Sequence, residues 1–421
     1  MSVVVVTIDK ASGGRALRVL FVSQWFDPEP VPKGLAFVKA LRDTGMDVEV
    51  VTGFPNYPGG RVYPGFRIRP MSREEADGIR ATRLALYPSH DRNALGRALN
   101  YLSFCFSVFW YLLLVARGKH DVIHVYHPPI TVGLAAVLAE IVWRRPVVLE
   151  VQDLWPDSLK ATGMADATPL VTGVGWICRF VYARSRRIIA QSHGMARALA
   201  ARGVPAQKLE VVHNWADLPL RQQGEHRPLG WPEAEFTVLF AGNLGLAQAL
   251  ETVIAAAARV RAARPGIRFI FLGSGIAEDG LRDEARRLKA DNVFFLPRVP
   301  MAEVDAYLQQ ADALLVHLAD DPLFELTVPS KTQAYMAAGR PVIMGVRGDA
   351  AELVERAGCG LVVPPQDPSA LAQAVIALAD MPEEARSRMG ERGRMFYESH
   401  LSVAHGVGKI AEVLRTAANA A

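Results

Sequence analysis

Short apolar runs alternate with helix-like segments along most of this chain. The first run, RVLFVSQWF from Arg18, leads into a proline-rich loop and then into the helix-like segment GLAFVKALRDTG. Later runs of the same kind are DVEVVTGFP, DVIHVYHPP, RPVVLEVQDLWP and RIIAQSHG. Each has the length and β-branched content of a strand and is followed by Gly, Pro, Asp or Ser. This alternation predicts βαβ units and a parallel sheet that is covered on both faces.

The same pattern begins again after a polar, proline-bearing stretch at residues 218–235. Here the runs are FTVLFAGNLG, IRFIFLGSG, NVFFLPRVP, ALLVHLADD, RPVIMGVRG and GLVVPP. We therefore predict an α/β protein of two Rossmann-like, doubly wound parallel-sheet domains, 18–215 and 216–395, followed by a helix at 396–421 that packs back. Because ligands of such sheets bind outside the carboxyl ends of the strands, two facing domains would enclose one central cleft. Residues 1–17 are interpreted as an appended tail.

Composition supports a globular protein, since half of the 421 residues are hydrophobic and 21% are charged. Three isolated cysteines indicate neither a disulfide framework nor a zinc site, which fits the cytoplasm. The apolar run at the start is too short for a signal peptide.

Charge is divided unevenly along the chain. Residues 1–210 hold 26 Lys and Arg against 17 Asp and Glu, whereas residues 211–421 hold 21 against 26. A basic first half suits anionic lipid or a diphosphate better than a nucleic acid, so no nucleic acid partner is expected. An uneven solvated surface is the plainer alternative.

Several motifs together resemble one family. The second half contains FAGNLGLAQALETV, LGSG, PSKTQAYMAAGRPVI and GCGLVVPPQD, and the first half contains SQWFDPEP, GFPNYPGG, YPSHDR, VYHPP and QDLWPDSLKATGM. This set is similar to the retaining GT-B-fold glycosyltransferases of family 4, and to the bacterial branch with colanic-acid and O-antigen L-fucosamine transferases. The resemblance implies an acceptor-binding first domain and a nucleotide-sugar-binding second domain.

Glycine loops after strands are the first candidates for donor binding. A glycine lets the backbone approach a phosphate, and the following helix start offers free amides. Gly34 has this position after the first strand, where the family places the donor phosphate and acceptor region, although a plain tight turn is the alternative. Gly242 and Asn243 have it in the second domain. Many relatives carry Arg and Lys in this second loop, where this chain has Asn243 and Gln248.

The segment PSK offers a cation in place of the Arg and Lys that many relatives carry in the second glycine loop. Ser330 would cap a helix and Lys331 would face the diphosphate, although these residues are also an ordinary helix signal. The family's pair of glutamates around this helix is broken, because Ala334 stands at the second position. Glu325 then remains for a donor-sugar contact and Gln333 for the ribose, unless Gln333 is a solvated helix residue. The resemblance also places base recognition at Arg298 and Val299, with an ordinary surface ion pair as the less favoured explanation of the arginine.

In addition to Lys331, two residues in the first half of the chain are candidates for catalysis. Asp153 in EVQDLWP could hydrogen-bond the acceptor hydroxyl, and Gln152 stands where relatives have histidine. His127 in VYHPP could supply the imidazole, or could be a structural loop residue. The chain contains no Asp-x-Asp motif, so we expect transfer without a metal or another cofactor.

Residues 101–116, YLSFCFSVFWYLLLVA, are apolar throughout and flanked by Arg92, Arg97, Arg117 and Lys119. A 16-residue helix is about 24 Å long, short of the ~30 Å hydrocarbon core, so it is not expected to span a bilayer. It is either a fully buried helix or a membrane-surface helix whose Phe104, Phe109 and Trp110 enter one leaflet.

The function expected from all of this is a metal-independent glycosyltransferase in surface polysaccharide synthesis. Its partners would be a nucleotide-sugar, with a UDP-sugar of N-acetyl-L-fucosamine type favoured, and a polyprenyl-diphosphate-linked glycan. It would work in the cytoplasm, peripherally bound to the inner face of the membrane. A nucleotide-sugar sensor without turnover and a nucleotide-sugar epimerase are the alternatives.

Overall fold

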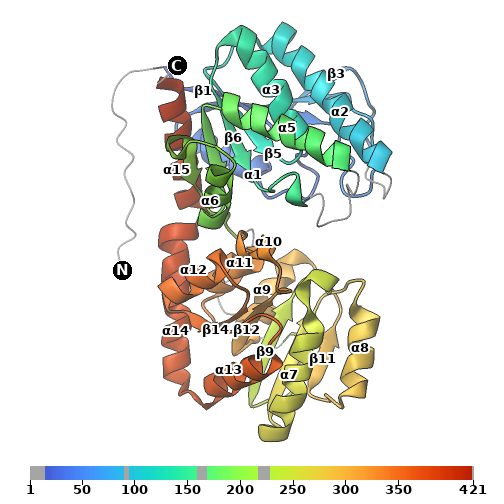
Figure 1. Ribbon diagram of the computed structural model, residues 1–421, viewed down its shortest axis with the longest axis vertical. Helices are drawn as coiled ribbons and strands as arrows, with labels where there is room; N and C mark the ends of the chain where they lie inside the picture. The colour runs from blue at the N-terminus through green and yellow to red at the C-terminus, as the bar shows by residue number, and fades with distance from the viewer. Residues whose placement is uncertain (1–14, 90–93, 159–167, 217–227, 420–421) are drawn as a thin grey trace. The chain divides into compact units, whose positions relative to one another are not determined.

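The computed structural model describes residues 15–89, 94–158, 168–216 and 228–419. Most of the expected tail at 1–17, much of the polar stretch at 218–235 and Arg92 lie outside the described residues. The chain forms two compact units (Figure 1). Unit 1 comprises Met1–Leu149, Arg184–Arg186 and Ala411–Ala421, and unit 2 comprises Glu150–Ala183 and Arg187–Ile410.

Strands from the first half of the chain form an eight-stranded sheet in the order β3-β4-β2-β1-β5-β6-β7-β8. Parallel pairs join β1 to β2 and β5, β2 to β4, and β7 to β8, whereas β3 is antiparallel to β4. The strands are β1 (Arg18–Val22), β2 (Asp47–Gly53), β3 (Met71–Ala76), β4 (Ile79–Leu84), β5 (Val122–His127), β6 (Val147–Val151), β7 (Arg187–Ala190) and β8 (Leu209–Val211).

The antiparallel edge is a tight hairpin that the apolar pattern does not predict. Asp77 and Gly78 form its turn with φ of +51° and +75°. Two successive positive φ values match the twist of the flanking strands, and Asp-Gly is a favoured pair for them. Both faces of β3 are largely polar, MSREEA, so no apolar periodicity marks it.

The helices of this part are α1 (Leu35–Asp43), α2 (Ala94–Tyr111), η1 (Leu112–Ala116), α3 (Ile130–Trp143), α5 (Thr168–Arg184), α6 (His193–Ala201) and η2 (Ala206–Lys208).

The second sheet has six strands in the order β11-β10-β9-β12-β13-β14. In chain order this is 3-2-1-4-5-6, the doubly wound order whose switch point lies between the first and fourth strands, here β9 and β12. The strands are β9 (Phe236–Ala241), β10 (Ile267–Leu272), β11 (Val293–Leu296), β12 (Ala313–His317), β13 (Val342–Gly345) and β14 (Gly360–Val362).

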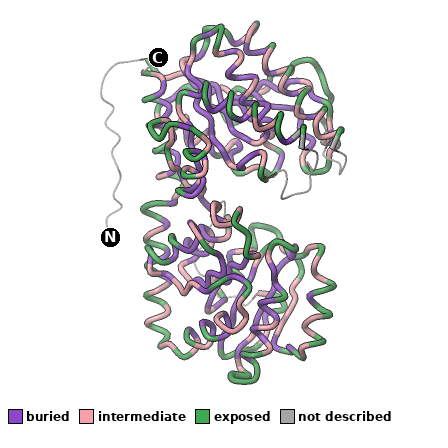
Figure 2. Tube along the Cα trace, viewed as in Figure 1, coloured by how far each residue is buried: buried purple, intermediate pink, exposed green. Residues whose placement is uncertain are grey.

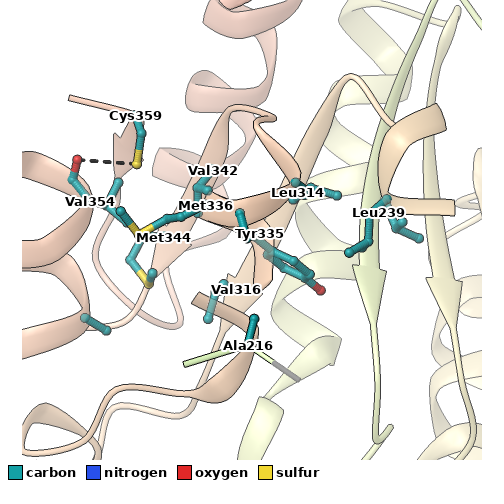
Figure 3. Packing of buried hydrophobic residues seen from close by; sticks show 14 of the residues in the cluster. Ala216, Leu239, Leu314, Val316, Tyr335, Met336, Val342, Met344, Val354 and Cys359 are labelled. Atoms are coloured by element: carbon teal, nitrogen blue, oxygen red, sulfur yellow. Dashed lines mark hydrogen bonds between the residues drawn. The ribbon is translucent and has the colours of Figure 1, made fainter. Parts of the chain in front are cut away.

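Apolar layers cover both faces of this sheet. Val238 and Phe240 of β9 belong to one hydrophobic cluster. Leu239, which lies between them in the strand, belongs to the other cluster together with Tyr335, as Figure 3 shows. Successive strand residues point to opposite faces, so burial of all of them requires helices on both sides. The structure confirms the predicted doubly wound α/β fold.

These layers are formed by η3 (Leu246–Gln248), α7 (Leu250–Ala263), α8 (Glu278–Arg287), α9 (Met301–Gln310), α10 (Pro322–Glu325), α11 (Ser330–Ala338), α12 (Asp349–Ala357), α13 (Pro368–Asp380) and α14 (Glu383–Phe396), with η4 (Tyr397–Leu401) and α15 (Val403–Asn419) closing the chain. Buried residues follow the strands, and exposed residues lie on the outer turns of the helices (Figure 2).

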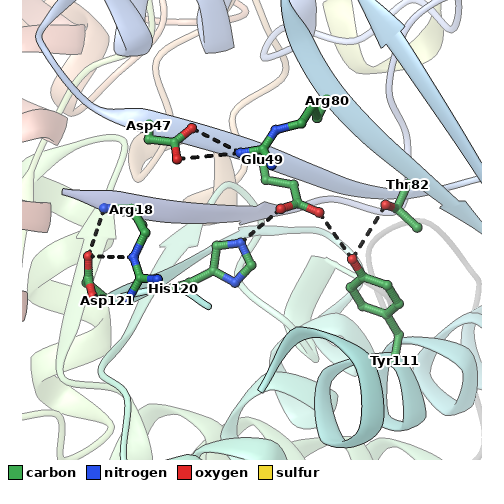
Figure 4. Close-up of polar contacts among 8 residues, drawn as sticks. All are labelled: Arg18, Asp47, Glu49, Arg80, Thr82, Tyr111, His120 and Asp121. Atoms are coloured by element: carbon green, nitrogen blue, oxygen red, sulfur yellow. Dashed lines mark hydrogen bonds and ion pairs between the residues drawn. The ribbon is translucent and has the colours of Figure 1, made fainter. Parts of the chain in front are cut away.

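Tyr111, the last residue of α2, attaches this helix to the first sheet through its hydroxyl group (Figure 4). Tyr111 Oη lies 3.3 Å from Glu49 Oε1 in β2 and 3.5 Å from Thr82 Oγ1 in β4. His120 Nε2 lies 3.2 Å from the other Glu49 oxygen, and this hydrogen bond holds the pKa of the Glu49 carboxyl below its usual value. One face of the helix is thereby held against the strands.

The same helix differs from the expectations for residues 101–116 in its length and its burial, while a place at the membrane surface stays a prediction. The apolar helix runs over Leu95–Ala116, 22 residues, which is long and apolar enough to cross a membrane by length and composition. It is not fully buried, since Phe106 is 65% and Leu114 71% exposed. Phe104, which the membrane-surface alternative places in the lipid, is 0% exposed and belongs to the core. An apolar sequence on all sides carries no signal of helical phase, so contacts alone decide which face is inside.

Candidate functional site

Two glycine-bearing loops press against each other at the carboxyl ends of β9 and β10. Gly242 has φ +138° and Gly273 has φ +145°. A Cβ on Gly273 would lie 1.9 Å from the Gly242 carbonyl oxygen, while the Gly242 amide donates to the Leu272 carbonyl at 2.8 Å. Only glycine adopts this backbone conformation at low cost, because it has no Cβ. The predicted Gly242 loop is therefore a place of close backbone packing beside the switch point.

Gly273→Ala should lower the free energy of unfolding by more than about 2 kcal/mol, because a strained φ alone costs on the order of 1–3 kcal/mol and a backbone clash is added to it. Gly280→Ala in α8 is the matched control, since a Cβ there meets no atom within 4 Å. That change should be neutral or stabilise the protein by about 0.5 kcal/mol. Urea unfolding measures both, and equal effects would contradict the packing described for the loops.

Lys331 brings a cation to this glycine loop. It is the second residue of α11, and its Nζ lies 3.5 Å from the centre of the Phe240 ring. A Cβ on Gly242 would lie 2.7 Å from Lys331 Cε and 3.0 Å from Nζ. Burial lowers the pKa of Lys331 to about 7. Within the described residues no carboxylate pairs with this amine, so it is available to a bound anion.

The start of α11 corrects two expectations. The residue at the N-cap position is Pro329, so the prediction that Ser330 caps the helix is wrong, and Ser330 is the exposed first helical residue. Gln333 is not solvated but 1% exposed, and with its amide nitrogen as donor it lies 2.9 Å from the Pro329 carbonyl and 3.2 Å from the Ser330 carbonyl. The side chain thus donates to two backbone carbonyls of the helix start. Roles of Ser330 and Gln333 in donor binding stay predictions.

The loop after β9 carries the amide side chains of Asn243 and Gln248, where many relatives carry Arg and Lys. Gly245 donates its amide to Gln248 Oε1 at 3.0 Å, and a Cβ on Gly245 would lie 2.6 Å from Asn243 Nδ2. Asn243 itself is exposed. The loop therefore presents neutral donors and acceptors, and Lys331 supplies the positive charge beside it.

A histidine that the sequence analysis missed fixes the same loop. His317 ends β12, donates from Nδ1 to the Gln248 carbonyl at 2.7 Å and accepts at Nε2 from the Gln366 amide at 3.3 Å. Burial lowers the pKa of His317, so the ring stays neutral and keeps this tautomer. A histidine that closes a strand-length apolar run, ALLVH, is the signal that could have indicated it.

The other predicted donor residues lie on neighbouring loops of unit 2. Arg298 is exposed and Val299 half-buried in the segment after the edge strand β11. Glu325 ends α10, and its carbonyl would lie 2.1 Å from a Cβ on Gly348, whose φ is +72°. These residues share the carboxyl side of the sheet with Gly242 and Lys331, but among the described residues no hydrogen bond or ion pair joins them to that pair.

Gly34 lies at the N-cap position of α1, and an internal anion already occupies that helix start. The Asp27 carboxylate accepts the Leu35 amide at 2.5 Å, and a Cβ on Gly34 would lie 2.0 Å from the same oxygen. The glycine is thus required by the close approach of Asp27. A carboxylate at this position competes with any phosphate for the amide.

His127 and Asp153 follow adjacent strands of the first sheet. His127 ends β5, is 0% exposed, and burial lowers its pKa to about 3. The imidazole is therefore neutral and a weak base at pH 7. Asp153 follows β6 and is exposed, although nearby protein raises the pKa of its carboxyl by desolvation. Gln152 is held between Glu150, to which it donates at 2.7 Å, and Asn214, from which it accepts at 2.7 Å.

Two family models match the chain almost end to end. Residues 35–215 match the glycosyl transferase 4-like domain, and residues 222–396 match the glycosyl transferases group 1. The chain is a family 4 glycosyltransferase of the GT-B fold.

Bacterial relatives of this chain are named as glycosyltransferases, one of them in colanic acid biosynthesis. It is 25% identical over 312 residues to the glycosyltransferase WbjE of Pseudomonas aeruginosa, covering 70% of this chain and 75% of WbjE. It is 26% identical over 317 residues to WcaI of Escherichia coli K12, named as a colanic acid biosynthesis glycosyl transferase, covering 72% of this chain and 76% of WcaI.

Solved structures share its fold at low identity. Anabaena HepE in complex with UDP-glucose matches with a TM-score of 0.65 and 17% identity, covering 95% of this chain and all of HepE. WaaG, a glycosyltransferase of lipopolysaccharide biosynthesis, matches with a TM-score of 0.61 and 14% identity, covering 94% of this chain and 99% of WaaG. The fold of the glycosyltransferase is thus the one found in these enzymes.

Proposed function

We propose that this glycosyltransferase moves a sugar from a nucleotide diphosphate to a polyprenyl-diphosphate-linked glycan in surface polysaccharide synthesis, such as O-antigen, capsule or exopolysaccharide, with retention of anomeric configuration. The names of WcaI and WaaG support the pathway. HepE is described with UDP and UDP-glucose, which supports a UDP-sugar as the first donor to test. The likeness to L-fucosamine transferases favours an N-acetyl-L-fucosamine-like sugar.

The observation that carries this proposal is the Lys331 amine beside the Gly242 loop at the switch point. Loss of the sugar leaves negative charge on the diphosphate, and a positioned cation with free backbone amides stabilises that charge. Lys331 at the start of α11 would take this role without a metal ion. We therefore propose metal-independent transfer, with a rate unchanged by EDTA, and no other cofactor.

Asp153 is our choice for the group that meets the acceptor hydroxyl. It is exposed beyond the carboxyl end of β6, and its raised pKa makes it a better proton acceptor than an ordinary aspartate. His127 is a poorer choice, since its pKa of about 3 leaves it little basicity at neutral pH.

A donor panel tests the proposal. UDP-, GDP- and dTDP-sugars are incubated with the enzyme and membrane lipid extract, and release of nucleoside diphosphate is followed. We expect saturable release from a UDP-sugar. Saturation by a GDP-sugar alone would contradict the assignment of the donor.

We further propose that the enzyme works at the inner face of the cytoplasmic membrane and meets it through one face of α2. The outer face of this helix is apolar, and its exposed residues recur at helical spacing: Leu95, Leu99, Leu102, Phe106, Trp110 and Leu114. Residues 94–119 contain no acidic residue, while Arg97, Arg117 and Lys119 lie among them. An apolar stripe with only basic charges fits an anionic lipid surface. Because the opposite face is packed on unit 1, the helix would lie in the interface.

Phe106→Asp with Trp110→Asp should reduce binding to phosphatidylglycerol vesicles at least tenfold, because two exposed apolar side chains lose lipid contact and two negative charges are added. Sedimentation with vesicles at low and high salt measures this, and salt should weaken binding of the parent protein.

Met395→Asp is the control, since Met395 is 58% exposed on α14, far along the chain from α2. It should leave vesicle binding unchanged. Equal binding by the double variant and the parent protein would contradict membrane contact through this face, as would a loss of folded protein in the double variant alone.

A further inference from the structure

Three separate segments of unit 1 share one pattern that no role described above uses. In each segment a buried amide side chain directly precedes a half-exposed aromatic side chain. The pairs are Gln24–Trp25 after β1, Asn56–Tyr57 after β2, and Asn100–Tyr101 in α2. Two of them lie in the motifs SQWFDPEP and GFPNYPGG.

The three amides contact one another and form a buried layer. Gln24 Nε2 donates to Asn100 Oδ1 at 2.5 Å, and Asn100 Nδ2 lies 3.4 Å from Asn56 Oδ1. All three side chains are at most 1% exposed. Asn100 also donates to the Tyr87 carbonyl at 2.7 Å, which adds the segment after β4 to the layer. Buried side chains that hydrogen-bond to one another in this way fix the loops that carry them, although Gln24 Oε1 itself accepts no hydrogen bond from the described residues.

A buried carboxylate strengthens the same connection. Glu29 is 3% exposed and accepts the backbone amides of Phe26 at 3.0 Å, Asn56 at 2.7 Å and Tyr57 at 2.8 Å. The loops after β1 and β2 are thereby joined through one side chain. Their aromatic residues are held in place before any ligand arrives.

The three aromatic rings also contact one another. The Trp25 and Tyr57 rings lie 4.9 Å apart at an interplanar angle of 34°, and the Trp25 and Tyr101 rings lie 6.4 Å apart at 71°. Tyr87, bonded to the same layer, is 52% exposed. We call Trp25, Tyr57 and Tyr101 the aromatic rim. It stands at the carboxyl ends of β1 and β2, the edge where ligands of parallel sheets bind.

We infer that the aromatic rim binds a pyranose ring of the acceptor glycan; this rests on the proposed function. The face of an aromatic ring is negative and attracts the C–H groups of a sugar, and tyrosine adds a hydroxyl at the ring edge. A rim fixed by buried hydrogen bonds loses little entropy on binding. A lipid chain would instead find its match on the larger apolar outer face of α2. Tyr101 and the exposed Leu102 are neighbours on that helix, so one element serves both ends of a lipid-linked glycan.

Trp25→Ala tests the inference, with Trp25→Phe retaining a ring. The probes are the butanol-extracted lipid-linked saccharides of the cells that make the enzyme, and the same saccharides released from lipid by mild acid. Saturation-transfer NMR with UDP present measures binding of the released saccharides, and label transfer measures the KM for the lipid-linked form. Trp25→Ala should weaken binding of the released saccharides about tenfold and raise the KM for the lipid-linked form by a similar factor. Trp25→Phe should change both quantities much less. UDP affinity, vesicle binding and the thermal unfolding midpoint should be unchanged.

Trp110→Ala is the matched control, because it removes the same ring from the outer face of α2. It should weaken vesicle binding and leave binding of released saccharides unchanged. Equal binding of released saccharides by Trp25→Ala and the parent, or no binding by the parent, would overturn the inference. A defect confined to the lipid-linked form would also overturn it, by assigning the rim to lipid. Failure of the proposed function would differ, since no donor would then release nucleoside diphosphate while saccharide binding is still measured.

Discussion

Lys331→Ala should lower turnover of the nucleotide-sugar donor by about two orders of magnitude, the usual effect of losing one charged contact to the leaving group in the transition state. The reason is the position of its amine over Phe240 and against Gly242. Initial rates of UDP release at saturating donor measure the loss. Lys409→Ala, an exposed lysine of α15, should have no effect. Turnover within about threefold of the parent would remove Lys331 from the site.

Affinity for UDP should fall about tenfold per pH unit as the pH rises above 7. Burial lowers the pKa of Lys331 to about 7 in the free enzyme, so near that pH a large fraction of the amines is neutral. A bound diphosphate favours the charged amine and raises its pKa, so UDP binding takes up a proton. Above the free pKa this proton must come from solution, and affinity therefore decreases with pH until the pKa of the complex is reached.

Calorimetric titration of UDP in buffers of different ionisation enthalpy measures both the affinity and the proton uptake. Lys331→Arg is the control, because a guanidinium stays charged across this range and should remove the slope. The neighbouring titratable groups do not mimic it. His317 has a lowered pKa and stays neutral, and Asp320 remains paired with Arg347 at 3.1 Å. Affinity independent of pH, or rising with it, would contradict a neutral Lys331 in the free site.

The alternation of apolar runs and helical segments was enough to predict two doubly wound α/β folds, because parallel strands buried on both faces carry no polar face to obscure them. It could not predict the strand order, since an apolar strand can pair on either side. The β3–β4 hairpin was missed because its strand MSREEA is polar on both faces. The sequence also leaves the phase of the apolar helix open, so it could not decide that Phe104 lies in the core and not at the outer face.

Some residues of the candidate site could likewise be predicted from the sequence, and others could not. Gly242 and Lys331 could be predicted because a glycine turn and a cation at a helix start have signals in the local sequence, and the structure brings these two together. The Ser330 cap was a wrong prediction, since the proline before it takes the N-cap position. His317 bonds to Gln366 and Glu29 bonds to Asn56, and both partners are distant in the chain. The position of His317 at the end of an apolar run marks the residue, but no local pattern predicts which residue either side chain contacts.

Transfer of labelled sugar to lipid tests the central claim most directly. The enzyme is incubated with a labelled UDP-sugar, butanol-extractable lipid acceptor and EDTA, and both the lipid fraction and free UDP are quantified. We expect label in the lipid fraction in equal amount to released UDP, with the anomeric configuration of the donor retained. Bound donor without any release, acceptor-independent conversion of the donor sugar, or transfer that stops with EDTA would contradict it.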